Sequence, residues 1–131
     1  MALEQPGFLI GVEAGENMTA MQHTLVMISA DMTVIQTNAA TDIPCGILQN
    51  TPNVGEAASV MVAGISKLIS GAGGLTAGSL VGPAADGKGI IADPDGAAEA
   101  YYFGQVLIAC AENEKASVLI NCAVPVLTAG S

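Results

Sequence analysis

The fold is decided by residues 42–64, which read DIPCGILQNTPNVGEAASVMVAG. Two apolar runs flank the segment TPNVG at 51–55, and after it Val60 and Val62 are separated by Met61. Alternation with a period of two is typical of a half-buried strand, whereas Pro, Asn and Gly favour turns. The stretch therefore predicts a β-hairpin.

A related pattern returns near the C-terminus. Five residues stand at one constant offset from identical residues of the first stretch: Gly104, Glu114, Ala116, Ser117 and Val118 match Gly46, Glu56, Ala58, Ser59 and Val60. Different turn residues fill the gap, Pro-Asn-Val-Gly in the first copy and Ala-Glu-Asn in the second. Two matched hairpins predict a pseudo-symmetric β domain.

Other segments also have strand character. The runs 23–30 and 33–37 are rich in Val, Ile, Met and Thr and face each other across a short turn, which predicts another hairpin. The last long strands are expected at 101–111 and 116–122, and a single helical turn at 38–42. Turn residues recur about every ten residues and no stretch has a clean helical period, so we expect an all-β barrel or sandwich.

The first 22 residues are expected to form an extended arm that precedes a single β domain at 23–131. One apolar segment lies inside this arm and must dock somewhere; it contains Phe8, Leu9, Ile10 and Val12. On its own chain the segment would be a first strand, whereas on a neighbouring subunit or a capsid it would be a tether. Under the tether interpretation, removal of residues 2–16 leaves the domain folded.

Charge is scarce in this chain of 131 residues, whose length suits one domain. Only 11% of the residues are charged, whereas about 25% is usual. Such a surface is expected where subunits meet, because interface centres are depleted of charge; the alternative is a monomer covered by Ser, Thr, Asn, Gln and Gly. The net charge of −9 argues against nucleic acid as a ligand, because phosphate binding depends on clusters of Lys and Arg.

No export signal or membrane span is expected. The N-terminus has no basic region, its apolar stretch at 8–12 is too short for a signal sequence, and the weakly polar region 54–81 contains Glu56, Lys67 and many glycines. The cysteines are odd in number and lack C-x-x-C spacing, which predicts buried thiols in a reducing compartment; they are Cys45, Cys110 and Cys122.

The sequence predicts no catalytic, metal or cofactor site. His23, the single histidine, is accompanied by no Gly-x-Ser-x-Gly motif, so a structural role is favoured. Residues 93–96 resemble the start of a calcium loop, but Gly104 stands where the loop needs a bidentate Glu, and a turn is predicted instead. The glycine-rich segment 71–74 is not followed by Gly-Lys-Ser/Thr, so it is interpreted as a connection. The aromatic cluster 101–103 is expected to pack in a core or an interface.

The ordered motifs resemble the small capsid cement, or head decoration, proteins of tailed bacteriophages. The pattern Gly-apolar-Leu-x-Asn-x-Pro, Gly-Glu-Ala, Val-x-Val-x-Gly is carried here by Gly46, Leu48, Asn50, Pro52, Gly55, Glu56, Ala57, Val60, Val62 and Gly64. It continues through Ala77-Gly78, Val81, residues 85–88, Gly104 and Val118, and so covers about residues 40–122. Ser79, where the family often has an acid, and residues 113–115, in place of a late Gly-Asp turn, depart from the pattern.

This resemblance implies a compact β-barrel or β-tulip-like domain made of hairpins, with a structural role and no enzymatic one. It implies a homotrimer on the outer surface of a phage head, where it clamps major capsid subunits without metal, cofactor, nucleic acid or membrane. Contacts to the capsid or a neighbour are expected from Phe8, Leu9, Ile10 and Val12, and structural turns from Gly46, Pro52, Gly55, Gly64, Gly78, Gly87 and Gly104.

Two alternatives to the cement role stay open. The first is a virion-surface module that binds host glycans, for which the aromatic cluster 101–103 is the motivation. The second is a small β-barrel enzyme or ligand carrier, which is supported only by His23 and scattered Asp residues.

Overall fold

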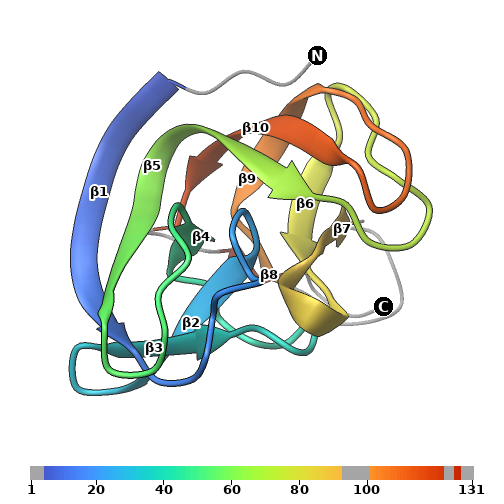
Figure 1. The fold of residues 1–131 in the computed structure, drawn as a ribbon. Helices are drawn as coiled ribbons and strands as arrows, with labels where there is room; N and C mark the ends of the chain where they lie inside the picture. The colour runs from blue at the N-terminus through green and yellow to red at the C-terminus, as the bar shows by residue number, and fades with distance from the viewer. Residues whose placement is uncertain (1–4, 93–100, 123–125, 128–131) are drawn as a thin grey trace.

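The computed structural model describes residues 5–92, 101–122 and 126–127, which form a nine-stranded sheet and a two-stranded one (Figure 1). The strands are β1 (Gln5–Ala14), β2 (Leu25–Ala30), β3 (Thr33–Gln36), β4 (Gly46–Leu48), β5 (Ala57–Ile69), β6 (Leu80–Pro83), β7 (Gly89–Ile91), β8 (Tyr101–Tyr102), β9 (Gly104–Ile108), β10 (Lys115–Asn121) and β11 (Val126–Leu127). One 3-10 turn, η1 (Ala85–Gly87), precedes β7. The predicted all-β class is confirmed, although the nine-stranded sheet as a whole is not a closed barrel.

The segment 38–42, expected to be a helical turn, has no helical assignment. The carboxylate of Asp42 accepts hydrogen bonds from the backbone N–H groups of Asn38 and Ala39 at 2.7 and 3.0 Å. An Asp side chain that satisfies nearby amides offers the backbone an alternative to helical hydrogen bonds. The segment instead forms a single hydrogen-bonded turn, in which the N–H of Asp42 donates to the carbonyl of Ala39 at 3.1 Å, so a turn is present where one was expected but it is not helical.

The first five strands are joined in a ring of pairings. β1 pairs antiparallel with β5 and, at Glu13 and Ala14, parallel with β3. β3 pairs with β2, β2 with β4, and β4 with β5. The predicted hairpin of residues 23–37 is confirmed as β2–β3, with register Met27↔Ile35 and Ile28↔Val34.

The expected division into an arm at 1–22 and a domain at 23–131 is wrong for residues 5–14. These residues form β1, which pairs with β5 from Gln5↔Ile65 to Glu13↔Ala57. Ala14 is buried in the core of the first five strands. Of the two alternatives that the apolar segment left open, the structure shows the first strand of its own sheet.

The two matched hairpins are confirmed, and their registers agree residue by residue. The first, β4–β5, has the pairs Ile47↔Met61 and Leu48↔Val60. The second, β9–β10, has the pairs Gln105↔Leu119 and Val106↔Val118. The residues of each pair in the first hairpin stand at the constant sequence offset from the residues of a pair in the second. The two hairpins therefore have the same register.

The repeat extends well beyond these hairpins. β2 and β3 correspond to β6 and β7, because Val26↔Gln36 and Met27↔Ile35 match Val81↔Ile91 and Gly82↔Ile90. β1 corresponds to the second half of β5. The antiparallel pair Val12↔Ala58, between β1 and β5, matches Leu68↔Ala116, between β5 and β10. The parallel pair Ala14↔Val34, between β1 and β3, matches the bridge Ser70↔Gly89 beside β7. We call residues 5–61 the N-terminal unit and residues 62–92 with 101–121 the C-terminal unit.

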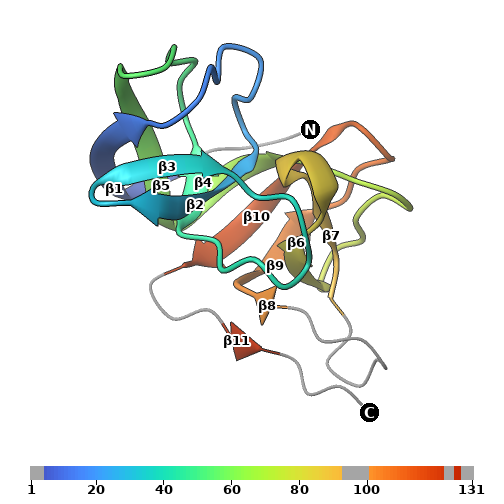
Figure 2. The same ribbon diagram turned by 90° about the horizontal axis from the view of Figure 1, so that it is seen from below.

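Strand β5 belongs to both units and runs from one to the other (Figure 1). Gly64 has φ 130° at this passage, a conformation that side chains other than glycine rarely adopt. Seen from below, β1 to β4 lie on one side of the molecule and β6 to β9 on the other (Figure 2). The sheet is therefore two similar units in tandem that share one long strand.

Each unit contains its own core. The smaller core lies inside the N-terminal unit and includes Val26, Leu48, Ala58 and Val60. The corresponding residues of the C-terminal unit, Val81, Val106, Ala116 and Val118, lie in the larger core. The larger core also takes up Leu25, Ile47 and Met61 from the N-terminal unit, and so it joins the two units.

Candidate interaction surfaces

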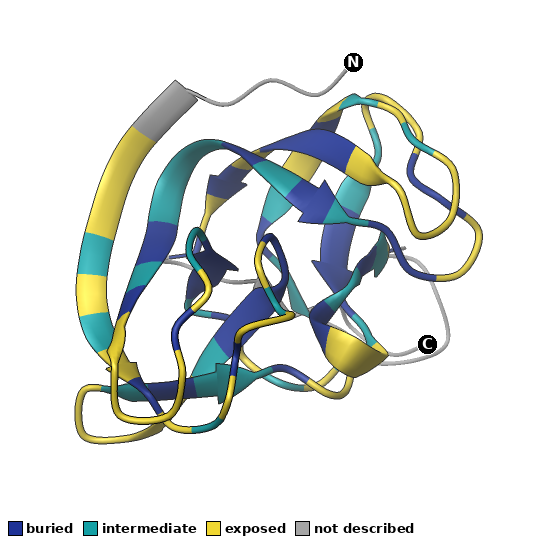
Figure 3. Ribbon diagram, viewed as in Figure 1, coloured by how far each residue is buried: buried dark blue, intermediate teal, exposed yellow. Residues whose placement is uncertain are grey.

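The four apolar residues expected to contact a capsid or a neighbour all lie on β1, but they differ in exposure. Phe8 and Leu9 are 63% and 47% exposed, whereas Ile10 and Val12 pack against the smaller core. The outer strand in Figure 3 shows this mixture of exposed and half-buried positions. The structure thus leaves Phe8 and Leu9 as the accessible part of the predicted set.

β1 also has an open edge. It pairs with β5 along residues 5–13, but it pairs with β3 only at Glu13 and Ala14. Among the described residues, no strand pairs with the other edge of β1 along residues 5–12. An unpaired edge offers N–H and C=O groups to an added strand.

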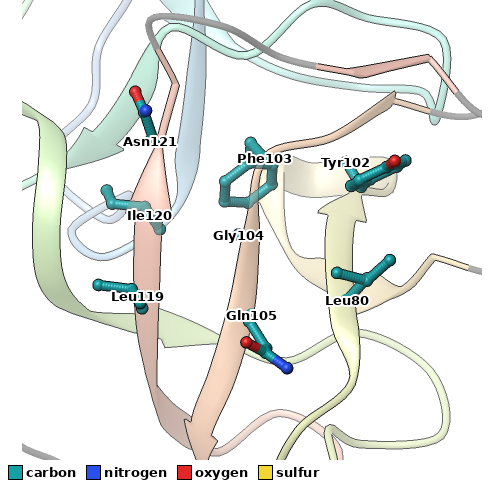
Figure 4. Close-up of a pocket in the computed structure, with 8 residues that line it drawn as sticks. All are labelled: Leu80, Tyr102, Phe103, Gly104, Gln105, Leu119, Ile120 and Asn121. Atoms are coloured by element: carbon teal, nitrogen blue, oxygen red, sulfur yellow. The ribbon is translucent and has the colours of Figure 1, made fainter.

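A second accessible surface is a hollow of about 420 Å³ on β6, β9 and β10. Its lining residues are Leu80, Tyr102, Phe103, Gly104, Gln105, Leu119, Ile120 and Asn121, none of them charged (Figure 4). Leu119 faces Gln105 across the β10–β9 pair, and Gln105 faces Leu80 across the β9–β6 pair. The amide of Gln105 is held by a 2.8 Å hydrogen bond that it donates to the carbonyl of Gly78.

A third surface lies beside β2, where exposed Ile28 and Ile43 line a hollow of about 540 Å³ together with Cys45 and Cys122. Burial raises the pKa of the Cys45 thiol to about 11 and raises the pKa of Cys122 further. Burial also raises the pKa of Cys110. None of the three thiols forms a disulfide. With raised pKa values they are protonated at neutral pH and therefore poorly nucleophilic.

The residues expected at turns divide into two groups. Gly55, Gly78 and Gly87 have φ of 82°, 87° and 66° in turns or in η1, and Pro52 lies in the loop between β4 and β5. The others lie within strands, so their prediction as turn residues is wrong: Gly46 in β4, Gly64 in β5 and Gly104 in β9. A Cβ on Gly46 would collide with the carbonyl of Met61, and one on Gly104 with the carbonyl of Leu119.

The remaining candidates from the sequence are His23, the aromatic cluster 101–103 and the segment 93–96. His23 is buried and has a φ of 65°. Its backbone N–H donates to the carbonyl of Leu48 at 2.8 Å, and the N–H of Gly78 donates in the same way to the carbonyl of Val106, which corresponds to Leu48. His23 thus fills the position that glycine fills in the C-terminal unit. Phe103 lies in the larger core, as predicted, with half-buried Tyr101 and Tyr102 before it. Residues 93–96 lie outside the described residues.

Two kinds of site are absent from the described residues. No group of three or more His, Cys, Asp or Glu in the described part of the chain is placed to hold a metal ion. No helix there is long and apolar enough to cross a membrane.

The hollow on β6, β9 and β10 was not predicted from the sequence. Leu80, Gln105 and Leu119 are far apart in the chain and follow no motif of their own. A signal was nonetheless present, because the constant offset between the hairpins places Gln105 and Leu119 at the positions of Ile47 and Met61. Comparison of the two copies could have singled out these positions.

Comparison with known proteins gives a match in structure only. No protein-family model matches the chain, and no curated protein matches it. Four chains of solved structures match, among them the crystal structure of the N base of the head fiber gp8.5 of bacteriophage phi29. The two chains are 18% identical, the TM-score is 0.65, and the match covers 88% of this chain and 94% of that chain. The chain therefore has the fold of this head-fiber base.

Proposed function

We propose that the chain is a structural protein of a phage virion, a cement or decoration protein that binds the outer surface of the head as a homotrimer and stabilises contacts between major capsid subunits. The observation that carries the proposal is the match to the phi29 head-fiber base over nearly the whole length of both chains. The cement-like motifs of residues 40–122 agree with it.

The surface of β1 supports a docking role. Phe8 and Leu9 are large apolar side chains that the fold leaves exposed beside an open strand edge. Burial of one such side chain contributes about 1.5–3 kcal/mol, and an added strand would satisfy the free backbone groups of the edge. We propose that β1 provides the capsid contact through Phe8 and Leu9.

Modest contacts of this kind suffice when they are repeated. Subunits held in a trimer present their second and third sites at high effective concentration, so avidity multiplies the affinity of a single site. A protein that binds only the assembled head stabilises it by mass action, by about 2.7 kcal/mol per site at a hundredfold excess over Kd. The head should therefore resist heat and low salt better with the protein than without it.

The test uses heads assembled from the major capsid protein encoded in the same genome. Purified chain is mixed with these heads, and bound protein is measured by sedimentation and the head disruption temperature by light scattering. We expect saturable binding and a higher disruption temperature. Phe8→Ser should weaken binding about tenfold or more, whereas Val54→Ser should not; Phe8 and Val54 are 63% and 62% exposed, and Val54 lies in the β4–β5 loop.

Two results would count against the proposal. Absence of binding to the heads by the folded chain would refute the cement role. Equal binding by the Phe8→Ser and Val54→Ser variants would refute the part assigned to β1.

A further inference from the structure

The tandem repeat places two corresponding rows of side chains on the two units. The N-terminal row is Leu25, Ile47 and Met61, which face one another across β2, β4 and β5. The C-terminal row is Leu80, Gln105 and Leu119, which face one another across β6, β9 and β10. Each row lies on the side of its unit that faces away from that unit's own core, because the alternate residues of the same strands fill that core.

The environments of the two rows are opposite. Leu25, Ile47 and Met61 are 0%, 0% and 1% exposed, because the C-terminal unit covers them. In the C-terminal row, Leu119 is 47% exposed, Gln105 is exposed and Leu80 is half-buried. This row lines the hollow of Figure 4. The row of the N-terminal unit is thus covered, whereas the row of the C-terminal unit is not.

The contact between the units shows what kind of surface covers such a row. Phe103 packs in the larger core together with the N-terminal row. Cys45 is the residue of the N-terminal unit that corresponds to Phe103. The backbone N–H of Phe103 donates to the carbonyl of Val81, and the N–H of Cys45 donates to the carbonyl of Val26, the residue that corresponds to Val81. Cys45 lies in the third surface, which also presents exposed Ile28 and Ile43. Within the described part of the chain, the C-terminal row is therefore uncovered, and so is a surface that corresponds to the one that covers the N-terminal row.

Charge favours a second copy as the occupant. The chain carries −9, so two copies repel each other wherever acidic residues approach. The hollow of the C-terminal row has no charged lining residue, and the third surface has one, Asp42. Interface centres are depleted of charge in the same way.

We propose that the C-terminal row of one chain binds the Ile28–Ile43–Cys45 surface of a second copy of this chain. The contact joins two different surfaces, so it is heterologous and closes into a ring when the rotation permits. The inference rests on the proposed homotrimer and deepens it by naming the two surfaces that meet.

The experiment measures the mass of the full chain by light scattering behind a sizing column, from micromolar to nanomolar concentration. Wild type should form a closed oligomer. Leu119→Glu should raise the midpoint concentration of assembly about 30-fold or more, as the loss of an interface hot spot does, and Ile28→Glu should act alike. Val54→Glu is the control, because Val54 is an apolar residue that is 62% exposed in the β4–β5 loop and lines neither of the two surfaces.

Circular dichroism and thermal melting check that each variant is folded. If Leu119→Glu melts early, Gln105→Lys replaces it, since Gln105 is exposed and a lysine can still donate to the carbonyl of Gly78. A wild type that stays monomeric, or folded Leu119→Glu or Gln105→Lys variants with the wild-type mass, would overturn the inference. An oligomer that Leu119→Glu breaks and Ile28→Glu does not would overturn the assigned partner surface.

The head-binding assay separates this inference from the proposed function. A monomeric wild type that still binds and stabilises heads would end the inference and leave the cement role standing. An oligomer that depends on Leu119 and fails to bind heads would end the cement role alone.

Discussion

Replacement of Gly104 by Ala provides a direct measure of how closely the paired strands approach. A Cβ on Gly104 would collide with the carbonyl oxygen of Leu119 on β10, and a Cβ on Gly46 would collide with that of Met61 on β5. Neither glycine has a positive φ, so Ala itself suits the backbone. The obstacle is the backbone of the neighbouring strand, which cannot rotate away as a side chain can.

The expected magnitude follows from two opposing effects. Overpacking in a close-packed region costs about 1–3 kcal/mol, whereas replacement of Gly by Ala within a strand gains about 0.5–1 kcal/mol. The free energy of unfolding should therefore fall by about 1–2 kcal/mol in Gly104→Ala, and by a similar amount in Gly46→Ala because the positions correspond. Such a loss lowers Tm by roughly 4–7 °C for a chain of this length.

The assay is urea unfolding followed by circular dichroism at one fixed protein concentration. Gly11→Ala is the control, because Gly11 lies in β1 and no heavy atom lies within 4 Å of its added Cβ; this variant should be as stable as wild type or slightly more stable. The reasoning would be refuted by a Gly104→Ala variant at least as stable as Gly11→Ala. Effects of opposite sign at Gly46 and Gly104 would refute the equivalence of the two hairpins.

Two further predictions concern β1 and the Cys45 thiol. Deletion of residues 2–14 should abolish cooperative unfolding, because it removes the partner of β5 along residues 57–65 and takes Ala14, Ile10 and Val12 from the smaller core; a truncated chain with the Tm of the full chain would contradict this. Stability should fall as the pH rises from 9 to 11, because the Cys45 thiol ionises near its ordinary pKa of 9.0 in the unfolded chain but only near 11 in the folded one. Thermal melts of wild type and Cys45→Ala across this range should differ in slope, and parallel curves would show that Cys45 does not contribute.

The parts of the fold that could be predicted from the sequence are those with local signals. Alternation around Met61 and the turn residues at 51–55 predicted the first hairpin, and the repeated Gly-Glu-Ala-Ser-Val spacing located the second. Both hairpins are signalled by the apolar period and by the turn residues between the strands, and a single stretch of sequence contains both signals. The exact agreement in register goes beyond the prediction of a pseudo-symmetric domain.

The position of β1 could not be read from the sequence because its partner is distant. β1 pairs with residues 57–65, more than 40 residues away, and Pro6, Gly7 and Gly11 weaken its strand pattern. The glycines of β4 and β9 were misinterpreted for a related reason. Glycine marks a turn when its φ is positive, but it marks a close backbone approach when it lies inside a strand, and only the tertiary structure separates these two uses for Gly46 and Gly104.

The two rows of side chains explain why this sheet would favour a closed assembly over an open one. A strand face that only meets water gains nothing from leucine, yet the C-terminal row has Leu80 and Leu119 on either side of Gln105. Within one chain, the tandem contact buries the N-terminal row, and no described residue covers the C-terminal row or the Ile28–Ile43–Cys45 surface. An open chain of copies would always leave one of each exposed at its ends. A ring buries every row at once, so ring closure adds the last contact without immobilising another subunit.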